Sequence, residues 1–78
     1  MTNKELYTQA FAEAFEADLD AVEQYAFQVS PGWDSIGHMS LVVALEDAFG
    51  VELEPAEIRG ITSFAQGIEI LRGKGVDI

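Results

Sequence analysis

The sequence contains no cysteine and little positive charge. Without cysteine, a small domain has neither a disulfide nor a thiolate metal site, so its hydrophobic core must hold it together, and a reducing compartment suits it. Four Lys and Arg residues stand against 14 Asp and Glu, a formal net charge of −10. Nucleic acids and anionic membranes would repel this chain, whereas proteins with basic patches would be attracted to it.

Long apolar runs are also missing. No stretch approaches the roughly 20 apolar residues of a transmembrane helix, and Met1–Tyr7 lacks the basic and apolar regions of a signal peptide. We therefore expect a cytoplasmic monomer that does not insert into membranes. The chain has 78 residues, 49% of them hydrophobic, which suffices for one compact domain over residues 1–78.

Metal ligands are sparse, because the chain has a single histidine and no cysteine. Asp18-Leu19-Asp20 with Glu23 is similar to part of a calcium loop, but the third acidic position, the central glycine and the correctly spaced final glutamate are absent. We expect no metal site. His38 itself is predicted to be partly buried and bonded to the backbone or to Trp33.

Local signals predict four helices, one of them short. Thr2 and Glu5 form a capping box, Gly50 is placed to end a helix, and Pro55 is placed to begin one. Apolar residues recur at helical spacing between these signals. The predicted ranges are Asn3–Phe15, Ser35–Phe49 capped by Asp34, Ala56–Arg59, and a last helix that a Ser63–Gln66 capping box opens and that runs to about Gly73.

A long first connection, residues 16–33, separates the first two helices. Asp18 or Asp20 could cap a short turn there, residues 27–30 alternate as an extended piece would, and Pro31-Gly32 marks a turn. Trp33 is predicted to anchor this loop. The apolar residues expected to pin the loop to the core are Val22, Tyr25, Phe27 and Val29. Together these features predict an all-α four-helix bundle with a long first loop.

The second predicted helix carries two apolar faces. At 100° per residue, one face is predicted to face the core, and its members are His38, Leu41, Val42, Leu45 and Phe49. The other face carries Ile36, Met39 and Val43, and Glu46 and Asp47 border it. A second apolar face is either covered by the bundle or available to a partner, and we expect partner docking. The other phenylalanines at helical spacing, Phe11, Phe15 and Phe64, are expected in the core.

Ser35 follows the helix cap Asp34 and admits three interpretations. It could be an ordinary first-turn serine. It could be a hydrolytic nucleophile with His38 as base and Asp34 as orienter, but Asp34 is needed as the cap, His38 is predicted to face the core, and the G-x-S-x-G pattern is missing. It could also be the attachment point of a prosthetic group, because a phosphate there would meet free N–H groups and the positive end of the helix dipole.

At this point the chain resembles the acyl carrier protein family. The similarity rests on a combination of segments with chain size, acidity and helix order, and it is strongest from Trp33 to Leu71. Its segments are Asp34-Ser35-Ile36, the helix Met39–Phe49 ending Leu-Glu-Asp-Ala-Phe, Gly50-Val51-Glu52-Leu53, the short helix near Pro55, and Ile61-Thr62-Ser63-Phe64.

The resemblance implies a carrier that is not itself an enzyme. Ser35 would bear 4′-phosphopantetheine, added from coenzyme A by a phosphopantetheinyl transferase with Mg²⁺, and Asp34 would help the transferase place its metal. Acyl groups would travel as thioesters to acyl-loading and acyl-transfer enzymes with basic docking patches, with Ile36, Met39, Val43, Glu46 and Asp47 as the docking residues. Family members also shelter acyl chains between their helices, and Trp33, beside the attachment serine, could contact an acyl cargo or a partner. An aminoacyl or peptidyl carrier and an unmodified acidic interaction module remain alternatives.

The sequence departs from the pattern of fatty-acid synthesis carriers just after the serine. There the positions are often acidic, whereas here Gly37, His38 and Ser40 are uncharged and the acids come later, at Glu46 and Asp47. This pattern is more similar to discrete carriers that serve specialised pathways, such as secondary metabolism, aminoacyl transfer and cell-surface glycan modification.

Overall fold

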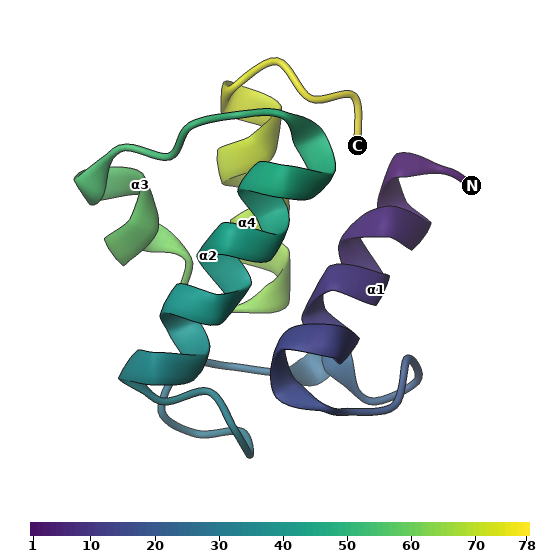
Figure 1. The fold of residues 1–78 in the computed structure, drawn as a ribbon, viewed down its shortest axis with the longest axis vertical. Coiled ribbons are helices and arrows are strands. Elements are labelled where there is room, and N and C mark those ends of the chain that lie inside the picture. The colour runs from purple at the N-terminus through teal and green to yellow at the C-terminus, as the bar shows by residue number, and fades with distance from the viewer.

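The computed structural model describes all 78 residues. It contains four α-helices and one short 3-10 helix, and its only strand-like pairing is an isolated bridge between Ala26 and Ser63. The elements are α1 (Asn3–Phe15), η1 (Val22–Gln24), α2 (Ser35–Phe49), α3 (Pro55–Gly60) and α4 (Phe64–Gly73). The predicted all-α bundle of three main helices and one short helix is confirmed (Figure 1). None of the helices combines the length and apolar character that a membrane span needs.

Short-range signals set the ends of the two longest helices. The Thr2 hydroxyl accepts a hydrogen bond from Glu5 N–H, and Thr2 N–H donates to the Glu5 carboxylate. The bond from the Thr2 backbone, followed by that from its side chain, lowers the pKa of Glu5. Gly50 ends α2 at φ +63°, a conformation that glycine adopts without strain. Both helices therefore begin and end as predicted, and α3 extends one residue beyond its predicted range at each end.

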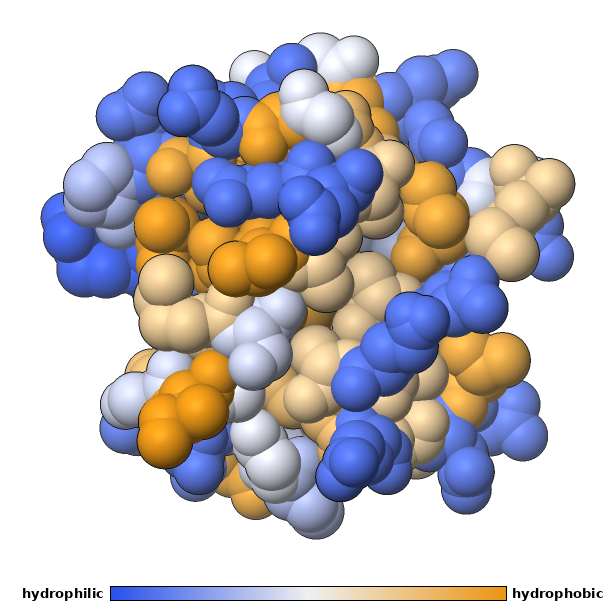
Figure 2. Space-filling model, viewed as in Figure 1, coloured by the Kyte–Doolittle hydropathy of each residue, from blue (hydrophilic) through white to orange (hydrophobic).

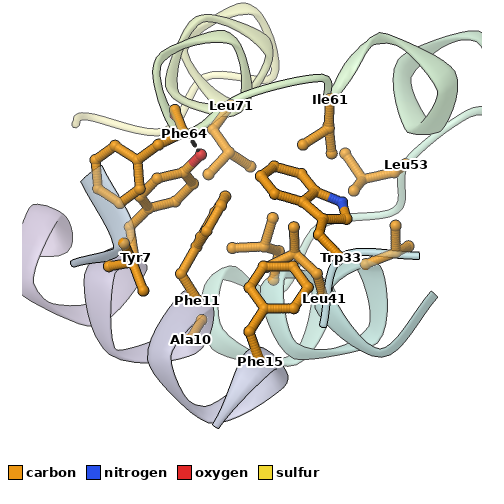
Figure 3. Close-up of a cluster of buried hydrophobic side chains, with 13 residues drawn as sticks. Tyr7, Ala10, Phe11, Phe15, Trp33, Leu41, Leu53, Ile61, Phe64 and Leu71 are labelled. Atoms are coloured by element: carbon orange, nitrogen blue, oxygen red, sulfur yellow. Dashed lines mark hydrogen bonds between the residues drawn. The ribbon is translucent and has the colours of Figure 1, made fainter. Parts of the chain in front are cut away.

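A cluster of aromatic rings lies within the core (Figure 3). Phe11 lies at its centre, with ring centroids 4.8 Å from Tyr7, 5.0 Å from Phe64, 5.4 Å from Trp33 and 5.8 Å from Phe15. Such tilted and edge-on pairs contribute about 0.5–1.5 kcal/mol each beyond the area they bury. Rings from α1, the first loop and α4 thus meet in one cluster without any covalent cross-link.

The first loop differs from its prediction in two places. Ala21, not Asp18 or Asp20, precedes η1, and no side chain caps this short helix. Residues 27–30 form a turn instead of an extended piece, because Gln28 N–H donates to Trp33 O at 2.8 Å and Gln28 adopts φ +65°. The prediction that Val29 pins the loop is therefore wrong, since Val29 lies in this turn with 82% of its surface exposed.

The remaining apolar residues of the loop do pin it, as expected. Val22 is fully buried, and Tyr25 and Phe27 pack against the core. The loop also pairs with the start of α4, because Phe27 N–H donates to Thr62 O at 3.0 Å and Phe64 N–H donates to Tyr25 O at 3.2 Å. These backbone bonds bring the segment that precedes α2 against α4.

The burial of Phe49 and the capping of α4 differ from the sequence prediction. Phe49 packs against the core but is only partly buried, because it is the last residue of α2 and lies at the edge of the bundle. In α4, the Ser63 hydroxyl accepts from Gln66 N–H, but the reciprocal bond of a full capping box is not formed. Ile68 is half-buried, and the small residue Gly67 is buried beside Phe64 and Leu71.

Gly67 leaves room for the hydroxyl of Tyr7. That hydroxyl is buried, which raises the pKa of Tyr7, and it donates to Phe64 O at 2.7 Å. A Cβ atom at position 67 would overlap the hydroxyl and lie 3.3 Å from Ile61 Cγ2. The tyrosine cannot move aside easily, because its ring is fully buried among Phe11 and Phe64.

We therefore expect Gly67→Ala to lower the free energy of unfolding by about 1–3 kcal/mol, although alanine is the better helix former. Gly73→Ala is the matched control, because it lies in the same helix with open space around it, and it should be neutral or stabilising. In a Tyr7→Phe background the penalty at Gly67 should shrink. Urea melts of the four variants measure these values, and a stabilised Gly67→Ala would contradict the packing described.

Candidate functional site

Ser35 is the first residue of α2 and lies at the protein surface. Asp34 precedes it in an extended conformation, and its Oδ1 accepts from Gly37 N–H at 2.8 Å. His38 N–H then donates to Asp34 O at 2.8 Å, which closes the first turn. The N–H groups of Ser35 and Ile36 precede the first intrahelical hydrogen bond, so this end of the helix favours an anion.

The first loop approaches this turn so closely that Gly37 has no room for a side chain. Gly32 follows Pro31 in a turn at φ +80°, and a Cβ atom at Gly37 would overlap the carbonyl oxygen of Gly32. From the sequence, Gly37 is predicted only to be an uncharged position after Ser35. Its structural role had one signal, a glycine inside a helix that begins just after a Pro-Gly turn.

Trp33 and His38 bracket the Ser35 turn from the inside. Trp33 is buried, and its Nε1–H donates to His38 Nδ1 at 2.9 Å, while His38 Nε2 lies 2.7 Å from Ile58 O. Indole nitrogen is only a donor, so Nδ1 must accept, and the proton of this neutral histidine is therefore assigned to Nε2, which donates to the carbonyl.

The predicted anchoring role of Trp33 is confirmed, and so is the expectation that His38 bonds to the backbone or to Trp33; it does both. Because Trp33 is 1% exposed, it offers no surface to a docked partner. A Ser35–His38–Asp34 triad does not form, because both ring nitrogens of His38 are engaged elsewhere and Asp34 Oδ1 bonds to the helix start.

The two faces of α2 are arranged as predicted. His38, Leu41, Val42 and Leu45 are buried, whereas Ile36, Met39 and Val43 are 80%, 50% and 52% exposed. The exposed residues form an apolar stripe, and together with Ser35 and Ser40 they line a shallow, open hollow. On the face in Figure 2, apolar surface gathers along α2 and between α2 and α1, with many hydrophilic side chains around it.

The two acids expected to border the stripe differ in their surroundings. Glu46 is half-buried, and its carboxylate accepts from Leu53 N–H at 2.9 Å, so it holds the segment after α2 in place. Sequence reasoning missed this internal role, because the contact depends on how the chain turns after Gly50. Asp47 is exposed, forms no ion pair and lines the groove between α1 and α2.

Negative charge dominates the chain as a whole, whose formal net charge is −10. Three of the four basic side chains already form ion pairs, and these pairs are Lys4–Glu23, Arg72–Glu69 and Lys74–Glu57. In the last pair, Lys74 Nζ lies 3.0 Å from Glu57 Oε1. The pKa of Glu57 is lowered chiefly by the hydrogen bond from Glu54 N–H and then by Lys74. No three His, Asp or Glu side chains gather as metal ligands would.

No protein-family model matches this chain. The features that bear on its function are the geometry of the Ser35 turn and the apolar stripe beside it.

The Asp34 cap can be tested by its effect on stability. Asp34→Ala should lower the free energy of unfolding by about 0.5–2 kcal/mol, because Gly37 N–H loses its acceptor. Asp34→Asn should retain most of that stability, since asparagine caps helices about as well. Thermal melts compare the two, and equal losses would mean that the charge of Asp34, not its cap, stabilises the turn.

Proposed function

We propose that this protein is an acyl carrier protein that bears 4′-phosphopantetheine on Ser35 and is not itself an enzyme. The observation that carries the proposal is the exposed Ser35 hydroxyl at the start of α2, directly beside an exposed apolar stripe. The resemblance of residues 33–71 to carrier proteins supports the same assignment.

The residues around Ser35 fit this group. The N–H groups of Ser35 and Ile36, at the positive end of α2, suit a phosphodiester. The hollow lined by Ile36, Met39 and Val43 offers apolar surface beside the point of attachment. When bound, the group supplies a terminal thiol that carries acyl groups as thioesters, a sulfur that this cysteine-free chain does not provide.

Attachment requires an enzyme that reaches Ser35 from solvent. A phosphopantetheinyl transferase would join Ser35 Oγ to the phosphate next to pantetheine while the pyrophosphate bond of coenzyme A breaks. Adenosine 3′,5′-bisphosphate would leave, and the hydroxyl proton would be lost. Because His38 is engaged in the core, the base and the Mg²⁺ must come with the transferase, and Asp34 keeps an exposed carboxylate beside the serine.

The acidic surface and the stripe define the partners of this carrier. Acyl-loading and acyl-transfer enzymes would contact Ile36, Met39 and Val43, with basic residues facing Asp47 and other exposed acids. The uncharged residues after Ser35 favour specialised pathways over housekeeping fatty-acid synthesis. An aminoacyl or peptidyl cargo would use the same attachment site.

Modification of Ser35 is the direct test. Incubation with coenzyme A, Mg²⁺ and a broad-specificity transferase should add the mass of one phosphopantetheine, and Ser35→Ala should abolish the gain. Ser40→Ala should keep it, because Ser40 lies in the second turn, where the N–H groups already bond within the helix. Intact-protein mass spectrometry measures the product. If several transferases add nothing to the folded wild type, an unmodified interaction module becomes the better interpretation.

The docking role of the stripe predicts a separation of binding from stability. Met39→Glu should raise the KM of the transferase reaction by about tenfold, or ~1.4 kcal/mol. It should change the free energy of unfolding by less than about 0.5 kcal/mol, because Met39 is half-exposed. Gln24→Glu adds the same charge to an exposed position of η1, which packs against α1 and α4, and it should leave the KM unchanged. A large loss of stability in Met39→Glu would place Met39 in the core instead.

A further inference from the structure

His38 joins two parts of the molecule that the chain keeps apart. Its Nδ1 accepts from the Trp33 indole just before α2, and its Nε2 donates to Ile58 O in α3. The imidazole itself is buried and lies against the rings of Phe27 and Trp33, with centroids 4.9 and 6.2 Å away. One rigid ring therefore spans the space between the start of α2 and α3.

The bond to Trp33 closes a ring around the attachment serine. Trp33 and His38 flank the segment Asp34–Gly37, and Trp33 Nε1 lies 2.9 Å from His38 Nδ1. The cap bond from Gly37 N–H to Asp34 Oδ1 and the backbone bond from His38 N–H to Asp34 O hold the same segment. These short contacts hold the Ser35 turn. The Trp33–His38 bond also connects the turn, through His38, to Ile58 in α3.

Helix α3 has few attachments to the rest of the molecule. It has six residues and none of them is fully buried, and a helix this short is not stable by itself. Its Ile58 carbonyl meets His38, and the half-buried Ile58 side chain packs against the core. Its Glu57 carboxylate meets Lys74 at the end of α4, and Gly60 lies close to Ile70. Segments with few buried contacts open most readily, so α3 is a candidate for displacement while the aromatic core stays intact.

We propose that His38 is a positioning residue that couples the seating of α3 to the geometry of the Ser35 turn. When α3 is seated, its Ile58 carbonyl fixes the imidazole, and the imidazole holds Trp33 and the turn between them. When a partner or a cargo displaces α3, the imidazole loses one of its two bonds and the turn loosens. The consequence for modification rests on the proposed function of Ser35, whereas the coupling itself does not.

The coupling can be measured without any modification of the protein. Trp33 is the only tryptophan, so its indole N–H gives a single resonance whose hydrogen exchange reports the Trp33–His38 bond. Lys74→Met removes the ion pair that attaches α3 to α4 while keeping the aliphatic part of the side chain. It should speed exchange of the indole proton by at least about threefold, a coupling within the usual range for connected residues.

Two near-isosteric replacements of His38 separate its bonds. The amide oxygen of His38→Asn approximates Nδ1 and retains an acceptor for Trp33, but it cannot reach Ile58. The amide nitrogen of His38→Gln approximates Nε2 and retains the donor to Ile58. Once α3 is disconnected in His38→Asn, Lys74→Met should no longer alter indole exchange. An unchanged rate in Lys74→Met, or an equal acceleration with and without His38, would overturn the coupling.

The consequence for Ser35 is tested by transferase kinetics on the same proteins. His38→Gln, which loses the bond to Trp33, should lower kcat by at least about threefold with little change in KM. His38→Asn, which keeps that bond but loses Ile58, should have a kcat between those of His38→Gln and the wild type. Val22→Ala truncates a buried side chain that forms no part of the Trp33–His38–Ile58 contacts. It controls for general destabilisation and should leave kcat unchanged. Equal loss in all three variants would make His38 merely structural. Failure of the wild type to be modified would reject the carrier function instead and leave the exchange result standing.

Discussion

The packing of the start of α2 against α3 depends on one buried polar atom, the indole nitrogen of Trp33. The ring is 1% exposed, so its N–H must find an acceptor inside the protein or leave an unsatisfied donor. His38 is that acceptor, and its other nitrogen then requires a partner of its own, which Ile58 O supplies. Burial of Trp33 therefore requires His38 as an acceptor, and His38 in turn requires the Ile58 carbonyl of α3. No buried side-chain polar atom in the chain is left without a hydrogen bond.

Helix α2 contributes one face to the core and leaves the other at the surface. Aromatic rings from α1, the first loop and α4 pack with the buried face of α2, so only that face of α2 is needed for folding. The opposite face can then keep Ile36, Met39 and Val43 exposed at no cost to the core. Under the proposed function, the attachment serine and the docking stripe lie on the same helix, and a partner that contacts the stripe is already beside Ser35.

The sequence was sufficient where the determining contacts are local. Thr2 with Glu5, Asp34 before Ser35, and Gly50 after Phe49 act within one turn, so the bounds of α1 and α2 were predicted correctly. The exposed stripe followed from helical spacing alone. Local reasoning predicted a backbone partner for His38 without identifying which one, and it missed the role of Glu46. The partner of His38 is a carbonyl 20 residues away, and the partner of Glu46 is a backbone N–H beyond the end of its helix.

Val29 and Gly37 show the same limit on a smaller scale. The alternation of residues 27–30 is compatible with a strand, but pairing of Gln28 N–H with Trp33 O turns the segment back and leaves Val29 exposed. That turn carries Gly32 against Gly37, where only a residue without a side chain fits. A pattern read one segment at a time gives neither result, because each depends on the path of the loop against the helix.

These constraints also bear on why Ser35 suits attachment better than catalysis. A hydrolytic serine needs a nearby base that is free to take its proton and an orienting group for that base. Here the neighbouring aspartate caps the helix, and the only histidine is held by Trp33 and Ile58, so both candidates already have structural duties. What remains at the surface is a hydroxyl at the positive end of a helix, with an apolar stripe beside it. Such a serine depends on a visiting enzyme for its activation, and its exposed position on a chain of net charge −10 suits a basic partner.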